Sequence, residues 1–216
     1  MTKKQRALIV IEHLKNDYPD AKCSLEYSKP YELLIATRLS AQCTDARVNI
    51  VTKVLFEKFS TLESLANASV EELEELIHSC GFYRTKSADV KKMCNQLIND
   101  YNGELPNSIE ELTKLSGIGR KTANLIMGDI FGQPAYVCDT HCIRITNHIG
   151  LTQGKDATKV EEQLRLCIPP NESNNFCHRL VLHGRAVCTA RSPKCSQCSL
   201  NAVCIDGISQ IKSQKE

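Results

Sequence analysis

Four cysteines close to the C-terminus are the clearest chemical feature of the sequence. They fall within seventeen residues with the spacing C-x6-C-x2-C-x5-C, as Cys188, Cys195, Cys198 and Cys204. Four thiolates from one short segment form a tetrahedral sulfur cage, which suits zinc or an iron–sulfur cluster. The residues between them are rich in Ser, Pro, Lys and Gln, so they build no core of their own. The spacing therefore predicts a metal or cluster site, and it leaves the choice of metal open.

The other eight of the twelve cysteines are scattered along the chain. No secretory signal is recognisable near Met1, so we expect reduced thiols rather than a disulfide framework. Most have apolar or helical neighbours, which favours a role as small buried hydrophobes. These residues are Cys23, Cys43, Cys80, Cys94, Cys138, Cys142, Cys167 and Cys177.

A glycine turn suggests an anion-binding site in the middle of the chain. It reads Leu115-Ser-Gly-Ile-Gly-Arg-Lys-Thr-Ala123 and joins two expected helices. Two glycines permit a tight turn and close approach of another molecule, and free N–H groups at the start of the next helix bind anions such as a DNA phosphate. Helix–helix turns also use glycine for geometry alone, so the motif by itself is weak evidence.

Lys121 lies in the first turn of the helix after that glycine turn. A cation is disfavoured there, because the helix dipole is positive at its N-terminus. A solvated surface lysine is one interpretation. In the other, the helix field, partial burial and the neighbouring Arg120 favour the neutral amine, which can attack as a nucleophile and form a Schiff base.

Asp139 also has two interpretations. It precedes an expected helix that carries Ile143, Ile145 and Ile149, where an N-cap residue belongs. Capping alone would explain an aspartate at this position. A carboxylate can equally move a proton or stabilise positive charge on a sugar with oxocarbenium character.

The elements that position these residues are expected to be helices. Apolar residues recur at helical spacing, capping residues and glycines mark the ends, and no long period-2 run occurs, so the sequence predicts an all-α fold. Gly132-Gln133-Pro134 is the best interior break, and the polar stretch after Ile208 is expected to fray. The expected helices comprise one ending before Pro19, one over 31–39, one beginning at Thr44 or Asp45, one after a Ser69–Glu72 capping box and ending by Gly81, one over 87–99, one after a Ser108–Glu111 capping box, and those over 120–130, 140–149, 158–166 and 176–187.

The bulk composition argues against a membrane-spanning protein and excludes few other classes of protein. No apolar run is long enough to cross a bilayer. The formal net charge of +2 does not by itself indicate a nucleic-acid binder, so DNA affinity would require local clustering. Arg185, Arg191 and Lys194 form one such cluster, with no acidic residue from Gly184 to Cys198. A phosphate-contacting loop and a solvated basic loop explain this cluster equally well.

Taken together, these motifs resemble the endonuclease III family of the helix-hairpin-helix DNA glycosylase superfamily. The glycine turn, Val137-Cys-Asp-Thr-His141 and the cysteine spacing carry the resemblance. Three further stretches match in the same order: Leu39-Ser-Ala-Gln-Cys-Thr-Asp45, Gly81-Phe-Tyr83 with Lys86, and His183-Gly-Arg185. The resemblance thus extends through nearly the whole chain.

The resemblance implies two helical domains that flank a DNA-binding groove. One would span residues 23–133 and hold the helix-hairpin-helix. The other would be discontinuous, with residues 1–22 and 134–216, and would carry a [4Fe–4S] cluster on the four C-terminal cysteines. The implied partner is double-stranded DNA with a damaged base or abasic site. A monomer in the cytoplasm of a bacterium or archaeon is expected.

The implied activity is that of a bifunctional DNA N-glycosylase and abasic-site lyase of base excision repair. Lys121 would attack C1′ of the deoxyribose of an oxidised pyrimidine, and the Schiff base would allow β-elimination. Asp139 would be the catalytic carboxylate. Gln42 would fill the space of the flipped nucleotide, with Phe82 as a wedge. The implied DNA contacts as a whole are Gln42, Phe82, Gly117, Gly119, Arg120, Thr122, His141, Arg185, Arg191 and Lys194.

Two departures from the family pattern stand out. Ser116 occupies a hairpin position that is usually proline, and we expect a slightly looser turn as a result. The chain has no tryptophan, although relatives can carry one in the stretch that matches 178–182. Neither departure affects Lys121 or Asp139.

Three alternatives compete with the lyase interpretation. An adenine-mismatch glycosylase of the same superfamily typically lacks the lysine and carries an extra C-terminal domain. A non-catalytic DNA-binding module would use the hairpin and cysteine loop only to contact phosphates. An electron-transfer protein would explain a cluster but would leave the hairpin unexplained. Lys121 counts against the first of these, and a Schiff base formed by Lys121 would exclude the others.

Overall fold

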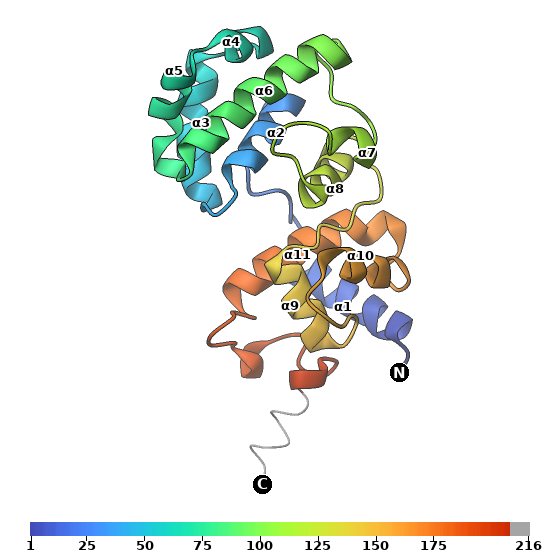
Figure 1. Cartoon of the computed structure of the whole chain (residues 1–216). Helices are drawn as coiled ribbons and strands as arrows, with labels where there is room; N and C mark the ends of the chain where they lie inside the picture. Colours follow the sequence, from blue (N-terminus) through green and yellow to red (C-terminus); the bar gives the residue numbers. More distant parts are fainter. Residues whose placement is uncertain (208–216) are drawn as a thin grey trace. The chain divides into compact units, whose positions relative to one another are not determined.

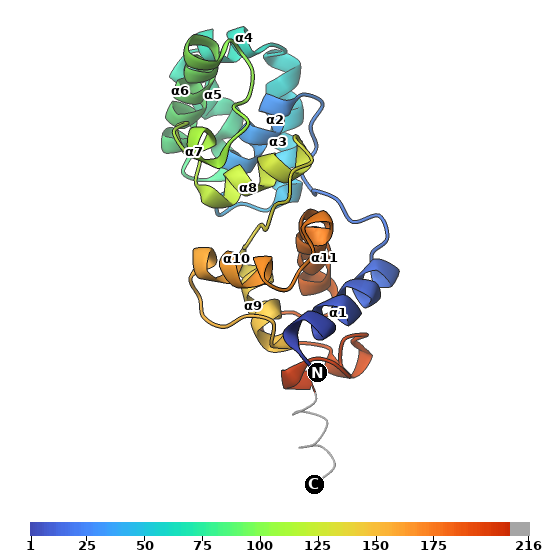
Figure 2. The same ribbon diagram turned by 90° about the vertical axis from the view of Figure 1, so that its right-hand side faces the viewer.

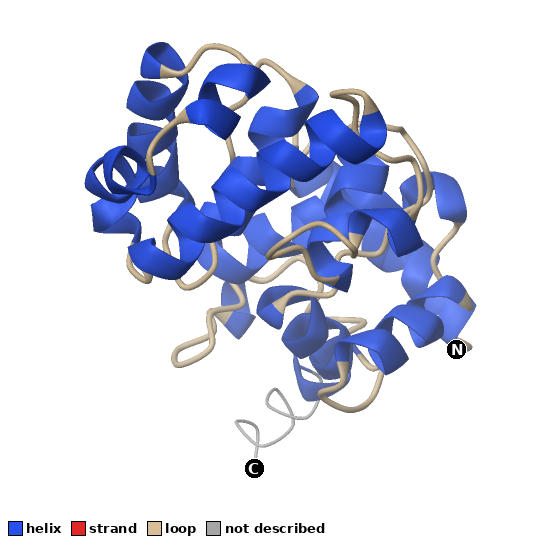
Figure 3. Ribbon diagram, turned by 45° about the horizontal axis from the view of Figure 1, so that its top comes forward, coloured by secondary structure: helices blue, strands red, loops and turns tan. Residues whose placement is uncertain are grey.

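Helices and loops make up the part of the chain that the computed structural model describes, residues 1–207 (Figure 3). The all-α prediction is confirmed there. The stretch after Ile208, for which we expected a frayed tail, lies outside these residues. The chain forms two compact units by internal packing. One is Cys23–Gly132, and the other combines Met1–Lys22 with the chain from Gln133 onward.

The unit Cys23–Gly132 is organised around its longest helix, α6 (Tyr83–Tyr101), shown in green in Figure 1. Helix α6 packs against α2, α4 and α5. Leu97, Met93 and Val90 of α6 are buried at helical spacing, so one face of this helix is committed to the core. The other elements of the unit are α2 (Pro30–Leu39), α3 (Asp45–Lys58), α4 (Leu62–Asn67), α5 (Val70–Ile77), the short 3-10 helix η1 (His78–Cys80), α7 (Ile109–Leu112) and α8 (Arg120–Asp129).

The second unit packs its N-terminal helix against helices from the far end of the chain. Helix α11 (Ser173–Ala186) contacts both α1 (Lys3–Asp17) and α9 (Thr140–Ile149), and Figure 2 shows α1 beside α11. Side chains such as Leu14, Ile145 and Phe176 fill the core between them. The remaining elements are α10 (Ala157–Arg165) and the 3-10 helices η2 (Pro170–Glu172) and η3 (Cys195–Gln197).

Capping residues set most helix starts as the sequence predicts. Thr44 rather than Asp45 caps α3, and the side chains of Ser69 and Glu72 form a reciprocal capping box at α5. The Ser108–Glu111 pair is only half of a capping box. Ser108 accepts the N–H of Glu111, but the Glu111 carboxylate accepts the Tyr101 hydroxyl instead of reaching back.

The apolar periodicity of the sequence did not reveal one short helix, and it placed the start of another helix too late. The six-residue α4 is too short to show a helical period, although Thr61 forms a capping box with Ser64. Helix α6 begins at Tyr83 rather than at residue 87, because its first turn is polar and gives no apolar signal. That first turn contains Lys86, whose side chain is buried.

Six of the eight scattered cysteines are buried, as expected for small hydrophobes. Cys23 and Cys43 are the two that are only half-buried. Burial raises the pKa of Cys94 to about 12, so this thiol is uncharged in the folded protein. In residues 1–207, every helix is too short or too polar to cross a bilayer.

Candidate DNA-repair site

The glycine turn forms a tight hairpin between α7 and α8. Gly117 has φ +73°, in the left-handed region that favours glycine. A Cβ at this position would lie 2.4 Å from Nε of Arg38. Arg38 in turn pairs with Asp89 through Nε at 2.8 Å and through Nη2 at 2.6 Å. The Arg38–Asp89 pair therefore packs against the hairpin backbone at the one place where only glycine fits.

Ser116 ties this hairpin to α6, which corrects our expectation of a looser turn. Its hydroxyl donates to Oδ1 of Asp89 at 2.8 Å. Its backbone N–H donates to Oε1 of Gln96 at 2.9 Å, a bond that proline could not make. The residue that replaces the usual proline thus adds two hydrogen bonds to the turn.

The start of α8 presents backbone donors next to the hairpin. Gly119 is the N-cap, and the first helical hydrogen bond runs from Ala123 N–H to its carbonyl. The N–H groups of Lys121 and Thr122 therefore precede the helical ladder and point out of the helix end. Thr122 is buried, so its side chain is not a surface contact for DNA. Arg120 is exposed.

Lys121 lies exposed in the first turn of α8. The partial burial that we expected around it is absent in the described residues. The side chain is instead accessible to a large ligand, directly beside the hairpin.

Asp139 is the N-cap of α9, as one of its two interpretations predicts. Its Oδ1 accepts the backbone N–H of Cys142 at 2.8 Å. Within residues 1–207, its other carboxylate oxygen has no hydrogen bond, and the side chain is half-buried. The cap fixes the carboxylate and leaves one oxygen available. His141 follows in the same turn, with Nδ1 3.2 Å from Nη2 of Arg144.

Two loops of the unit Cys23–Gly132 present exposed residues with left-handed backbones. Gln42, between α2 and α3, has φ 55°. Phe82, at the start of α6, has φ 48°, and its side chain is 66% exposed. Left-handed φ is costly for a side chain that is not glycine, and such conformations cluster at functional sites. A large apolar ring held in solvent by a strained backbone is typical of a side chain that inserts into a partner.

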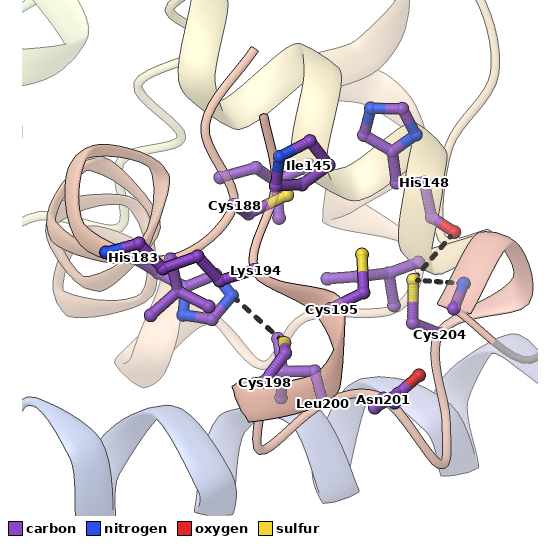
Figure 4. A pocket seen from close by; sticks show the side chains of 14 residues that line it. Ile145, His148, His183, Cys188, Lys194, Cys195, Cys198, Leu200, Asn201 and Cys204 are labelled. Atoms are coloured by element: carbon purple, nitrogen blue, oxygen red, sulfur yellow. Dashed lines mark hydrogen bonds between the residues drawn. The ribbon is translucent and has the colours of Figure 1, made fainter. Parts of the chain in front are cut away.

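The four C-terminal cysteines lie around one cavity, as their spacing predicts (Figure 4). His183 Nε2 lies 3.5 Å from Sγ of Cys198, and its Nδ1 lies 3.3 Å from the Tyr18 hydroxyl. Sγ of Cys204 is 3.3 Å from the His148 carbonyl oxygen and accepts the Gly207 N–H at 3.5 Å. These neighbours fix the orientation of two of the sulfurs.

Arg144 places a positive charge beside a third sulfur. Its Nη1 donates to the carbonyl oxygen of Cys188 at 2.5 Å and lies 3.6 Å from the Cys188 Sγ. Burial raises the pKa of Cys188 above its ordinary value, while Arg144 opposes that shift. The arginine thus favours the thiolate, which is the form that binds metals.

Four cysteine thiols around one cavity are a donor set that fits an iron–sulfur cluster. Burial raises the pKa of Cys198 to about 11, so the bare site disfavours the thiolate and requires a bound cation to hold it. The four cysteines line a cavity of about 30 Å³.

The cations expected to contact DNA near the cysteine loop are at the surface. Arg191 and Lys194 are exposed in the loop between Cys188 and Cys195, and Arg185 is exposed in the last turn of α11.

Sequence reasoning missed the side chains that support these sites. Arg38 lies in an expected helix and in no motif, while Lys86 and His183 belong to matched stretches without a function of their own. Their partners lie far away in sequence, 51 residues for Arg38 with Asp89 and 47 for Lys86 with Leu39. The only signal available was a lysine at a helical core position of α6.

Family models match most of the chain. Residues 35–170 match the model of the HhH-GPD superfamily base excision DNA repair protein. Residues 188–204 match the iron–sulfur binding domain of endonuclease III, over the range from the first to the fourth cysteine of the cavity.

Curated relatives match over nearly their whole length. Endonuclease III of Synechocystis sp. is 45% identical over 94% of this chain and 93% of its own. The enzyme of Bacillus subtilis is 41% identical over 91% and 90%. That of Escherichia coli K12 is 36% identical over 93% and 95%.

Solved structures agree with these matches. A trapped covalent intermediate of endonuclease III with DNA is 42% identical, covers 98% of this chain and 100% of its own, and has a TM-score of 0.91. A non-covalent endonuclease III–DNA complex gives a TM-score of 0.92 with the same identity and coverage. A thermostable thymine-DNA glycosylase, 20% identical with a TM-score of 0.83, shares the fold.

Proposed function

The chain belongs to the HhH-GPD superfamily of base excision DNA repair proteins and is a DNA glycosylase and abasic-site lyase with a [4Fe–4S] cluster, and we propose that Lys121 is its nucleophile. The position of Lys121 carries the proposal. Its amine is exposed in the first turn of α8, directly after a hairpin with backbone donors for a DNA phosphate. A relative that is 42% identical has been solved as a trapped covalent intermediate with DNA.

The reaction begins at the sugar. The lone pair of Lys121 Nζ forms a bond to C1′, and the damaged base leaves with the electrons of the N-glycosidic bond. Opening of the sugar ring then gives an imine between Nζ and C1′. Loss of a proton from C2′ expels the 3′ phosphate, and water hydrolyses the imine to free Lys121.

Asp139 assists at the charged stages of this reaction. Its Oδ1 holds the N–H of Cys142, while its second oxygen can accept a proton or stabilise positive charge on the sugar. Because the cap holds the carboxylate in one orientation, little reorganisation is needed when charge develops.

The substrate nucleotide must leave the base stack before Lys121 can reach its C1′. We assign Gln42 to the space that the nucleotide vacates and Phe82 to the role of wedge. Both are exposed, and both have backbones in the left-handed region. We expect oxidised pyrimidines and abasic sites as substrates, in double-stranded DNA.

DNA phosphates are bound by backbone and cationic groups. Gly117, Gly119 and Arg120 supply the hairpin site, with Thr122 acting through its N–H alone. His141 of α9 and the exposed cations Arg185, Arg191 and Lys194 extend the contacts along the backbone.

The two units correspond in this proposal to the two helical domains of the family, with the boundary next to Gly132. Cys188, Cys195, Cys198 and Cys204 hold the cluster, which when bound cross-links the four thiolates and thereby fixes the loop that carries Arg191 and Lys194. We expect a monomer that works on chromosomal DNA in the cytoplasm.

Borohydride trapping tests the nucleophile. Wild-type protein mixed with abasic-site duplex and sodium borohydride is expected to form a covalent protein–DNA adduct. Lys121→Ala should reduce the adduct by at least about a thousandfold, since the imine requires the amine. Lys114→Ala is the matched control. Lys114 is also exposed and near the hairpin, but it pairs with Glu111, and its loss should leave the adduct unchanged.

Either of two results would overturn the assignment. Wild type that forms no adduct would exclude the lyase. Lys121→Ala that forms an undiminished adduct would place the nucleophile elsewhere in the chain.

A further inference from the structure

Lys86 is the most deeply buried cation of the described residues, and its ammonium group joins two loops. Its side chain is 1% exposed. Nζ donates to the carbonyl oxygen of Leu39 at 2.8 Å, of Ala41 at 2.8 Å and of Cys80 at 2.9 Å. Leu39 is the last residue of α2, Ala41 lies in the turn between α2 and α3, and Cys80 ends η1.

The geometry matches the chemistry of an ammonium group. A protonated lysine has three donors and no acceptor, so three carbonyls satisfy it completely. Burial lowers the pKa of Lys86 from its ordinary value, which is the cost of placing a cation here. In residues 1–207, no carboxylate forms an ion pair with it. A leucine or methionine would fill this core position at lower cost, so packing alone does not explain a lysine.

The carbonyl groups that accept from Lys86 lie close in sequence to the two residues that we propose to insert into the DNA base stack. Gln42 follows directly after Ala41, and Phe82 lies two residues after Cys80. Both have left-handed backbones, at φ 55° and φ 48°. Such a conformation is costly for a residue other than glycine and persists only where the surroundings determine it. The Lys86 bonds are a restraint common to both loops.

We propose that Lys86 is a positioning residue for base flipping, whose ammonium group fixes the spacing between the Gln42 and Phe82 loops. With that spacing fixed, both side chains enter the DNA stack together and hold the target nucleotide outside it. Lys86 contacts neither the DNA nor the reacting sugar. The inference rests on the proposed function, because it needs Gln42 and Phe82 to insert into DNA.

Lys86→Met tests the proposal, because methionine keeps the length and apolar stem of the side chain and removes all three donors. Lys91→Met is the matched control. Lys91 is on the same helix, and its Nζ donates to the carbonyl of Ala68 at 2.6 Å, at the end of α4 and away from both loops. Thermal unfolding of both variants measures the loss that any missing lysine bond would cause.

The decisive measurements depend on base flipping. Single-turnover excision of 5,6-dihydrothymine from a paired duplex should slow by about tenfold or more in Lys86→Met, as for a barrier raised by a lost positioning contact. Borohydride trapping at an abasic site in single-stranded DNA, where nothing has to be unstacked, should change less than about twofold. Binding of the wild type should change the fluorescence of 2-aminopurine placed opposite an abasic site, and binding of Lys86→Met should not. Lys91→Met should behave as wild type in all three measurements.

A double-variant comparison asks whether Lys86 acts through the two inserted residues. In a Gln42→Ala, Phe82→Ala background, Lys86→Met should slow excision by less than about twofold, because the side chains it positions are gone. If Lys86→Met fails to fold, Lys86→Arg serves instead. A planar guanidinium directs its donors differently, so it should give the same pattern at smaller magnitude.

The outcomes separate this inference from the proposed function. Equal slowing by Lys86→Met on paired duplex and on single-stranded abasic DNA would overturn the positioning role, as would full additivity with the double variant. Wild type that forms no adduct with abasic DNA would remove the lyase itself, and the inference would fall with it.

Discussion

At the scale of single residues, the conformation and contacts of one glycine explain why the hairpin needs it. Gly117 combines a left-handed φ of +73° with a position where a Cβ would lie 2.4 Å from Arg38 Nε. Gly119, two residues later in the same motif, has φ −102° and no atom within 4 Å of its Cβ position. The sequence presents these as equivalent glycines, but the structure makes only the first one conformationally obligatory.

Alanine substitution should separate the two glycines. Gly117→Ala should lower the free energy of unfolding by about 1–3 kcal/mol, because the residue keeps an unfavourable φ and displaces Arg38 from Asp89. Gly119→Ala should change it by less than about 0.5 kcal/mol. Urea unfolding of both variants measures the difference. Equal losses would show that the Arg38 contact does not constrain the turn.

At the scale of elements, α6 supports every candidate DNA-contacting loop of its unit. Lys86 holds the Gln42 and Phe82 loops, Asp89 binds Ser116 and Arg38, and Gln96 accepts the Ser116 N–H. Residues 86, 89, 93 and 96 follow one another at three- and four-residue steps, so they share one face of the helix. Contacts with this one helix therefore position both the hairpin and the two residues that we propose to insert into DNA.

The same helix shows what sequence could and could not predict. The four cysteines were recognisable from residue type and short spacing, whereas the roles proposed for Lys121 and Asp139 came from the family resemblance. Lys86 and the Arg38–Asp89 pair were not recognisable, because their roles come from partners that only the fold brings close. The partial burial expected for Lys121 was wrong for a related reason. Helix position follows from sequence, whereas exposure depends on how the elements pack.

Ser116 provides the test at this scale. Ser116→Ala removes the hydroxyl that donates to Asp89 and keeps the N–H that donates to Gln96. We expect a loss of about 1–2 kcal/mol in the free energy of unfolding, because the acceptor is a charged, half-buried carboxylate. Thr113→Ala is the control, since its hydroxyl donates to the Glu110 carbonyl on the exposed side of α7 and should cost less than about 0.5 kcal/mol. Equal costs in urea unfolding would mean that Ser116 does not support the hairpin.

At the scale of the whole molecule, the proposed nucleophile and the cluster belong to different units. Lys121 lies in Cys23–Gly132, while the four cysteines lie in the unit that contains α1, α9 and α11. Each unit has its own buried core, so the cluster should stabilise one core far more than the other. Loss of the cluster should then open the molecule locally rather than globally.

Cys195→Ser tests this independence by removing one cluster ligand. Purified without oxygen, the wild type should contain iron and sulfide in equal amounts, and the variant should lose most of both. Amide hydrogen exchange should speed up in α9, α11 and the cysteine loop by about tenfold or more, because a structural metal site contributes directly to folding energy. Exchange in α6 should change by less than about twofold.

The control is Cys167→Ser, which alters a buried cysteine of the same unit that is not a cluster ligand. It should keep its iron and its slow exchange in α9. Stoichiometric zinc without sulfide in the wild type would contradict the cluster. If α6 lost protection as fast as α9 in Cys195→Ser, the two units would unfold together. The cluster would then stabilise the framework around Lys121 as well, and the lyase would depend on it although no cysteine ligand belongs to that unit.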